Sequence, residues 1–221
     1  MSREIPSKRK YQLKKRADEM AATRRRITEA AVELHGTVGP ARTTLSAVAE
    51  RAGVQRHTVY RHFPSEETLF GACSAHYFTA HPLPDLEAWR AIDEPSDRLA
   101  QALDDLYAYY ERTEPMLSNV LRDAELVDAI RLTLVPLEGF LAEAAEILAA
   151  GLPVCGRRRH VLTAALRHAL DFHTWRSLAA DTGIGRAEAI ELVTALVEAT
   201  AASQSRAAAD GTKHCSTSTS V

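Results

Sequence analysis

The segment from Thr43 to Pro64 constrains the fold more than any other part of the chain. Two short runs with helical spacing of apolar residues flank Gly53, and glycine tolerates the positive φ that a tight turn needs. Ala49 is small at the point where two steeply crossing helices would touch. Further apolar residues could close a small core between them: Val48, Ala52, Val54 and Val59. This combination predicts a helix-turn-helix motif over about residues 44–63, rather than a generic helical hairpin.

The same segment resembles the DNA-reading domain of TetR-family transcriptional regulators. Between Arg24 and Phe70 the chain contains Thr-Thr-x-x-x-Val-Ala-x-x-Ala-Gly-Val and then Val-Tyr-Arg-His-Phe-Pro-Ser-x-Glu-x-Leu. Outside these motifs the chain is similar to the family in length and helix count. The resemblance implies a homodimer and a palindromic double-stranded DNA operator with two half-sites. It also implies a pocket in the rest of the chain, where an unknown small-molecule effector would bind and release the DNA.

Helical periodicity continues on both sides of the motif. One helix is expected from about Thr23 to Gly36 and another from Pro64 to Phe78, before prolines 82 and 84 interrupt the pattern. Five more helices are then expected, three of them with a proline near the start; they cover about residues 95–112, 114–131, 135–150, 157–180 and 186–204. No stretch alternates as a strand would. We therefore predict an all-α fold. Together with the resemblance, this implies an N-terminal three-helix helix-turn-helix DNA-binding domain and a C-terminal helical ligand-binding and dimerisation domain.

Composition along the chain suggests four segments. Residues 1–20 are predicted to form a flexible basic arm, and residues 21–70 the DNA-binding domain. Residues 71–204 would form the helical ligand-binding and dimerisation domain, and residues 205–221, rich in Ser, Thr and Ala, a disordered tail.

Charge is distributed very unevenly between the two ends of the chain. Residues 1–62 hold 14 Lys and Arg against six Asp and Glu, a net charge of +8. The remaining residues hold 13 against 23, a net charge of −10. This distribution is typical of a protein that binds a polyanion at one end only, although a merely solvated basic face would look similar.

The second helix of the motif, at about residues 55–62, should present its polar side chains to DNA. Val59 and Phe63 would face the core and leave the other side exposed, with Arg56, His57, Thr58 and Arg61. Arg56 could bind a guanine or a phosphate, and Thr58 a base edge or a thymine methyl group. The resemblance implies phosphate contacts for Tyr60 and His62.

Other reader residues are expected to meet the DNA backbone. Thr44 is placed to cap its helix and to leave a backbone donor for phosphate. Arg24 and Arg25 would open the first helix beside the duplex. The basic arm could enter the minor groove, or attract the duplex without becoming ordered.

Two residues depart from the family pattern. Gln55 stands where a serine or similar capping residue usually opens the recognition helix. Glu66 stands where a lysine commonly faces phosphate, so its carboxylate would favour the helix dipole but repel DNA.

Aromatic and polar residues in the C-terminal part suggest a ligand pocket, because buried Tyr and Trp need partners for their polar tips. The candidates are Trp89, Tyr107, Tyr110, Met116, Arg122, Phe140, Phe172, His173 and Trp175. Arg122 and His173 could orient a polar or anionic ligand. Ordinary core packing is the alternative for each residue taken singly. Wide apolar stripes in the helices at about 157–180 and 186–204 would form the homodimer interface, or else close the core of one subunit.

Other functional classes find little support. Histidine pairs spaced five apart, such as His168 and His173, lie about 140° apart around a helix, so no metal site is expected. No catalytic motif or cofactor fingerprint is present, and lysines occur only at 8, 10, 14, 15 and 213. The three cysteines fit reduced thiols in a bacterial cytoplasm, and no membrane span is evident.

We therefore expect a sequence-specific DNA-binding regulator without catalytic residues or cofactor, a repressor released by a small molecule and bound to the nucleoid when active. A regulator without a small-molecule inducer, or an all-α enzyme with an appended DNA reader, remain the alternatives.

Overall fold

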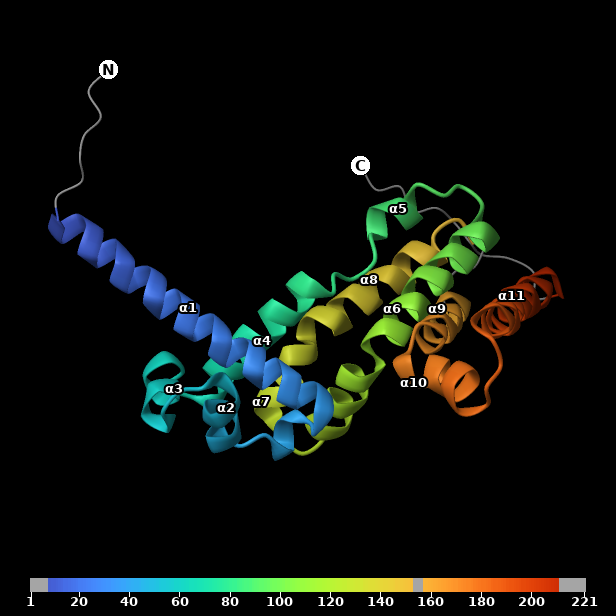
Figure 1. Cartoon of the computed structure of the whole chain (residues 1–221). Coiled ribbons are helices and arrows are strands. Elements are labelled where there is room, and N and C mark those ends of the chain that lie inside the picture. Colours follow the sequence, from blue (N-terminus) through green and yellow to red (C-terminus); the bar gives the residue numbers. More distant parts are fainter. Residues whose placement is uncertain (1–7, 153–156, 211–221) are drawn as a thin grey trace, which may run out of the picture. The chain divides into compact units, whose positions relative to one another are not determined.

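The computed structural model describes residues 8–152 and 157–210. Within these ranges the secondary structure is helical and contains no strand (Figure 1), which confirms the predicted all-α class. The chain forms two compact units. The first comprises Met1–Pro82 and Thr113–Leu134, and the second comprises Leu83–Arg112 and Val135–Val221.

The first unit holds the helix-turn-helix. Its elements are α1 (Lys8–Thr37), the 3₁₀ turn η1 (Pro40–Arg42), α2 (Leu45–Ala52), α3 (Arg56–His62), α4 (Glu66–Ala80), the end of α6 (Pro95–Ala124), α7 (Asp128–Arg131) and the 3₁₀ turn η2 (Leu132–Leu134). Helix α1 packs against α2 and α4, and α2 packs against α3. Residues 113–134, which the sequence placed in the second domain, therefore pack with the reader helices.

The second unit is a separate group of helices. It contains α5 (Leu86–Arg90), the start of α6, α8 (Val135–Ala149), α9 (Arg157–Ala169), α10 (Phe172–Trp175), the π-helical segment η3 (Arg176–Asp181) and α11 (Arg186–Asp210). Helix α9 packs against both α8 and α11. Among the described residues, no helix is both long and apolar enough to cross a membrane.

Several helix boundaries differ from the prediction. Residues 8–20, which were predicted to belong to a flexible arm, form the beginning of α1 as regular helix. Helix α6 runs through Pro115, where the sequence suggested that a new helix begins. Conversely, the helix expected over residues 157–180 ends at Ala169, because Asp171 starts α10 by accepting a hydrogen bond from the His173 N–H at 2.8 Å. At the other end, α11 continues to Asp210; the rest of the predicted tail lies outside the described residues.

The reader core contains the apolar residues that the motif predicts. Val48, Ala49, Ala52 and Val59 are buried together with Ile27, Ala31, Phe63 and Leu69. Gly53 ends α2 in the left-handed conformation, at φ 64° and ψ 39°, and its N–H donates to α2 carbonyls. A Cβ there would meet nothing within 4 Å, so the backbone conformation alone makes glycine the favoured residue.

A buried arginine organises the second unit. Arg98 is only 8% exposed, and its guanidinium donates to backbone carbonyls at the end of α8, those of Ile147 and Ala150, at 3.3 and 2.9 Å. It also donates to the carbonyls of Ile92 and Asp93, at 2.8 and 3.1 Å. The positive charge therefore lies at the negative end of the α8 dipole and satisfies carbonyls that helix geometry leaves without partners.

Candidate functional sites

Helix α2 is held at its start by Thr44. The Thr44 side chain accepts a hydrogen bond from the Ala47 N–H at 3.1 Å, which confirms its expected capping role. This bond fixes the beginning of the motif. The phosphate contact expected at the same residue stays a prediction.

Helix α3 is anchored on one side and exposed on the other. Val59 and Phe63 are buried in the reader core, while Arg56, His57 and Arg61 are exposed. Thr58 is half-buried and lies 3.5 Å from the His57 ring nitrogen. This seven-residue helix thus presents a short basic face on a fixed backbone, as a recognition helix requires.

Arg56 and Tyr60 form a pair on the exposed face of α3. The Arg56 Nη2 donates to the Tyr60 hydroxyl at 3.1 Å, and its guanidinium carbon lies 5.6 Å from the centre of the tyrosine ring. Because a guanidinium carries five N–H donors, this single bond leaves others for a base edge or a phosphate. Tyr60 thereby orients Arg56, a relation that the sequence did not reveal.

The two departures from the family pattern have different consequences. Within the part of the chain that the structure describes, the Gln55 side chain makes no capping hydrogen bond, so the start of α3 is weakly capped as expected. Helix α4, in contrast, starts with a complete capping box in which Ser65 and Thr68 exchange hydrogen bonds of 3.3 Å. Glu66 is exposed in its first turn and free to act on any phosphate nearby.

Arg24 and Arg25 have structural partners. The Arg24 Nη1 donates to the His62 carbonyl at 2.5 Å, and its guanidinium lies over the Phe63 ring at 4.1 Å. Arg25 pairs with Glu29 at 3.5 Å on the exposed side of α1. Arg24 therefore connects α1 to the end of the recognition helix, and a DNA contact by either residue stays a prediction.

His62 is buried rather than displayed. The residue is only 9% exposed, and its Nε2 has no hydrogen-bond partner among the described residues. Burial lowers the pKa of His62, and the Arg61 and Arg24 cations lower it further. The imidazole is therefore neutral at pH 7, so a phosphate contact would have to use an N–H donor rather than a positive charge.

The end of α6 is joined to the reader by a polar cluster, which we call the clasp: Asn119, Arg122 and Asp123. The Asn119 amide donates to the carbonyls of His35 and Gly36, at 3.1 and 3.0 Å. Asp123 accepts from the Ala41 N–H at 2.9 Å and from Arg122 at 2.7 Å. Burial is the largest single effect and opposes ionisation of Asp123. The two hydrogen bonds and the charges of Arg122 and Arg42 together outweigh it and lower the pKa of Asp123.

Gly39 makes the close approach at the clasp possible. Its φ is 93°, and an added Cβ would collide with the side chains of Arg122 and Asp123. The neighbouring His35 is 5% exposed, and burial lowers its pKa to about 4 against the opposing attraction of Asp123. The His35 imidazole is therefore neutral at pH 7.

The predicted ligand residues do not form one group. Arg122 belongs to the clasp, and Met116 lies beside Gly36, so both are in the first unit. In the second unit, Trp89 donates its indole N–H to Asp105 at 2.8 Å and packs on Phe140 at 5.7 Å between ring centres. This accounts for the polar atom of Trp89 without a ligand.

The remaining aromatic candidates form a cluster around Tyr110. The hydroxyls of Tyr107 and Tyr110 donate to the carbonyls of Ala169 and Leu170, at 2.9 and 2.7 Å, and so satisfy the end of α9. Phe172 and Trp175 pack on Tyr110, with ring centres 5.4 and 5.8 Å away. The Trp175 indole N–H is buried without a partner among the described residues, and is the donor here that a ligand could use. His173, predicted to orient a ligand, is exposed.

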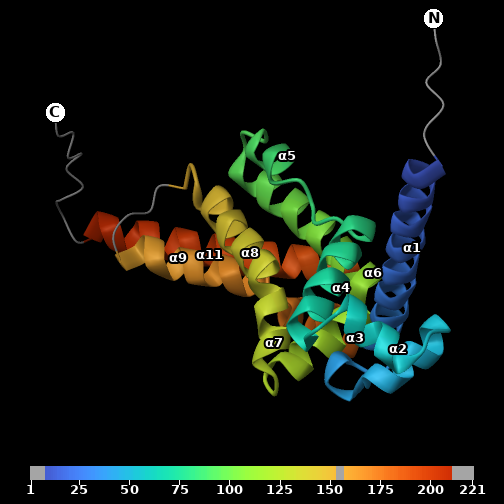
Figure 2. The ribbon, with the colours of Figure 1, turned by 90° about the vertical axis from the view of Figure 1, so that its left-hand side faces the viewer.

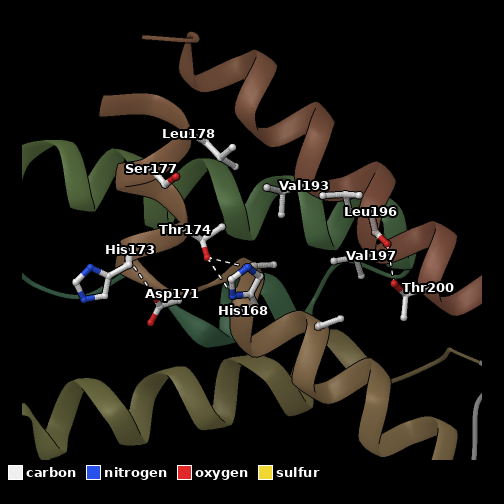
Figure 3. A pocket seen from close by; sticks show the side chains of 12 residues that line it. His168, Asp171, His173, Thr174, Ser177, Leu178, Val193, Leu196, Val197 and Thr200 are labelled. Carbon is white, nitrogen blue, oxygen red and sulfur yellow. Dashed lines mark hydrogen bonds between the residues drawn. The ribbon is translucent and has the colours of Figure 1, made fainter. Parts of the chain in front are cut away.

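A groove of about 460 Å³ lies between the end of α9, the α10 region and α11 (Figure 3). Val193, Leu196 and Val197 of α11 line one side. The opposite side includes His168, whose ring nitrogen lies 3.4 Å from the Thr174 hydroxyl. Apolar side chains of α9 and α11 are also unusually exposed: Val161 at 40%, Leu192 at 44% and Leu196 at 59%.

Sequence reasoning missed Asn119, Asp123 and Arg98. Each makes hydrogen bonds to backbone groups, which no side-chain motif reveals. The Asn119 partners, for example, lie more than 80 positions earlier in the chain. Polar residues within apolar helical runs were the available signal. Among the described residues, no group of three or more metal-ligating side chains lies together.

Comparison with known proteins places these features in context. The family model described as bacterial regulatory proteins, tetR family, matches residues 27–73. Curated relatives include an HTH-type transcriptional repressor of Mycobacterium tuberculosis and an HTH-type transcriptional regulator of Mycobacterium bovis. Each is 34% identical over 122 residues, which is 52% of this chain and 60% of the relative. The match thus spans less than two thirds of these relatives.

Solved structures share the fold across most of the chain. A TetR-family transcriptional regulator from Mesorhizobium loti is 22% identical, with a TM-score of 0.59 over 83% of this chain and 97% of its own. Another from Streptomyces coelicolor is 16% identical, with a TM-score of 0.61 over 86% of this chain and 85% of its own. At this identity the likeness concerns the fold: an N-terminal helix-turn-helix followed by a helical domain.

Proposed function

We propose that this chain, whose residues 27–73 match the family model of bacterial regulatory proteins, tetR family, is a sequence-specific DNA-binding transcriptional regulator. It would be a repressor that a small molecule releases from its operator. The observation that carries this proposal is the exposed basic face of α3 on its buried Val59 and Phe63 anchors. Arg56 is the residue that reads a base, because Tyr60 orients its guanidinium. Thr58 and Arg61 lie on the same short helix and complete the contact with the groove and its phosphates.

The regulator acts as a homodimer on a palindromic operator. The exposed apolar side chains of α9 and α11, with the groove beside them, support a second copy of the chain as the partner of this surface. A two-fold dimer presents two copies of α3, and two half-sites about 34 Å apart then match them. Such a protein would act in the bacterial cytoplasm, on the nucleoid.

The effector binds in the second unit, beside the aromatic cluster around Tyr110. The buried and unpartnered Trp175 N–H supports this location, because a buried donor without an acceptor costs free energy that a ligand could recover. Aromatic walls with one donor suit a largely apolar molecule carrying a hydrogen-bond acceptor. The curated relative that is named a transcriptional repressor supports the negative sign of the regulation.

Selection of duplexes from a random DNA library tests the proposal. We expect enrichment of an inverted repeat whose half-site centres are about one helical turn apart, or somewhat more. Enrichment without any preferred sequence, or of a single unrepeated site, would contradict it. The enriched duplex then serves as the probe for effector release: a Trp175→Phe variant should bind it as tightly as the unmodified chain but respond less to effectors.

A further inference from the structure

The first four turns of α1 form a surface that the DNA reader does not use. Residues 10–22 are exposed throughout, and in Figures 1 and 2 this part of α1 extends past α2, α3 and α4. Tyr11, Leu13 and Met20 are 63%, 59% and 57% exposed, so no part of the described chain covers them. Most helical stability in proteins comes from tertiary packing, which this part of α1 lacks among the described residues.

The charge of this projecting segment identifies the partner. Residues 10–16 contain four cations, Lys10, Lys14, Lys15 and Arg16, and no acidic residue. Lys15 lies 3.9 Å from Glu19, whereas Lys10 and Lys14 are one turn apart on the same face. A DNA duplex bound by α3 would be the strongly anionic surface closest to this segment. We propose that the segment binds phosphates of the DNA that flanks the half-site. The proposal rests on the DNA-binding function inferred above.

Helix dimensions decide how the segment can meet the duplex. With its side chains an α-helix is about 10–12 Å wide, whereas the minor groove of B-DNA is about 6 Å wide. A helical arm therefore does not enter the minor groove, which the basic composition alone had left open. Thirteen residues span about 20 Å, the rise of about six base pairs, so the helix reaches phosphates outside the sequence that α3 reads.

The test compares two lengths of the duplex enriched by selection. One ends at the outer edge of the half-sites, and the other carries about ten further base pairs of arbitrary sequence on each side, beyond the estimated reach of the helix. The variant Lys10→Gln with Lys14→Gln removes two charges and keeps similar helix propensity, which circular dichroism would check. The control Arg112→Gln with Arg131→Gln removes two exposed charges elsewhere.

We expect the lysine variant to bind the flanked duplex more weakly and with a shallower salt dependence. The slope of log K against log salt should fall by about 0.9 for each phosphate that the variant no longer neutralises. On the trimmed duplex the variant should bind like the unmodified chain, and the arginine control should behave normally on both. An equal loss of affinity on both duplexes would overturn the inference, and so would no loss on either. Binding to anionic phospholipid vesicles is measured alongside, and a variant that loses only this binding would also overturn it. If the unmodified chain binds neither duplex specifically, the proposed function itself fails.

Discussion

The hydrogen bond between Arg56 and Tyr60 gives these two residues of α3 different expected roles in DNA binding. The Tyr60 hydroxyl accepts from Arg56, and the guanidinium keeps further N–H donors for a base or a phosphate. Loss of Arg56 should therefore change which base is preferred, whereas loss of Tyr60 should change how firmly all sites are held.

We predict that Arg56→Ala relaxes specificity by about 1–3 kcal/mol at one base position in each half-site. Tyr60→Ala should mainly weaken binding to every sequence, because it would remove the expected phosphate contact. It should relax specificity less than Arg56→Ala does, through the freed Arg56. Binding measured on a panel of singly substituted operators checks this. Equal, sequence-independent losses in both variants would show that Arg56 reads no base.

Glu66 gives a second prediction at the residue scale. Its carboxylate favours the start of α4 through the helix dipole by about 0.3–1 kcal/mol, but repels a nearby phosphate. Glu66→Lys should therefore strengthen operator binding, increase the salt slope by about one and slightly lower the melting temperature. Glu67→Lys is the matched control, since it shares the first turn of α4. Lower stability with unchanged affinity would mean that Glu66 lies away from the duplex.

Among the elements, the end of α6 is bound to the reader through the clasp and His35. Because burial lowers the His35 pKa from 6.5 to about 4, the unfolded chain binds a proton more readily than the folded chain between these values. Stability from this residue is therefore complete above pH 6.5 and is lost as the pH falls toward 4.

We predict that His35→Phe makes the free energy of unfolding less dependent on pH between 6.5 and 4, by up to roughly 3 kcal/mol. Phenylalanine keeps a ring beside Phe70, whose centre lies 5.5 Å from that of His35. His57→Phe, at an exposed position of α3, is the control. Urea unfolding at several pH values provides the measurement, and identical pH profiles for all three proteins would contradict the assignment.

Helix α8 depends in a similar way on Arg98. Arg98→Met should lower the free energy of unfolding by about 2–5 kcal/mol, because it leaves several buried carbonyls without a donor. Arg90→Met removes exposed ion pairs with Glu87 and Glu143 instead and should cost less than about 1 kcal/mol. Thermal unfolding of both variants checks the difference, and similar small losses would mean that water replaces the arginine.

At the scale of the whole molecule, local patterns were predictable and distant contacts were not. The burial of Val48, Ala52 and Val59 and the Gly53 turn follow from the local pattern of residues 43–64, and both are confirmed. The role of Arg122 could not be read this way, because its position is set by Asp123 and by the approach of Gly39. Pro115 misled the helix prediction, since α6 continues through it.

The most direct test of the account is the affinity and stoichiometry of the chain on its selected operator. Titration at fixed salt should show two protomers bound per inverted repeat, with an affinity at least about 10³ times that for a scrambled duplex. It should also show a steep loss of binding as salt increases, because the contacts are largely to phosphates. Equal affinity for both duplexes, or one protomer per site, would contradict the central claim that paired α3 helices read a specific DNA sequence.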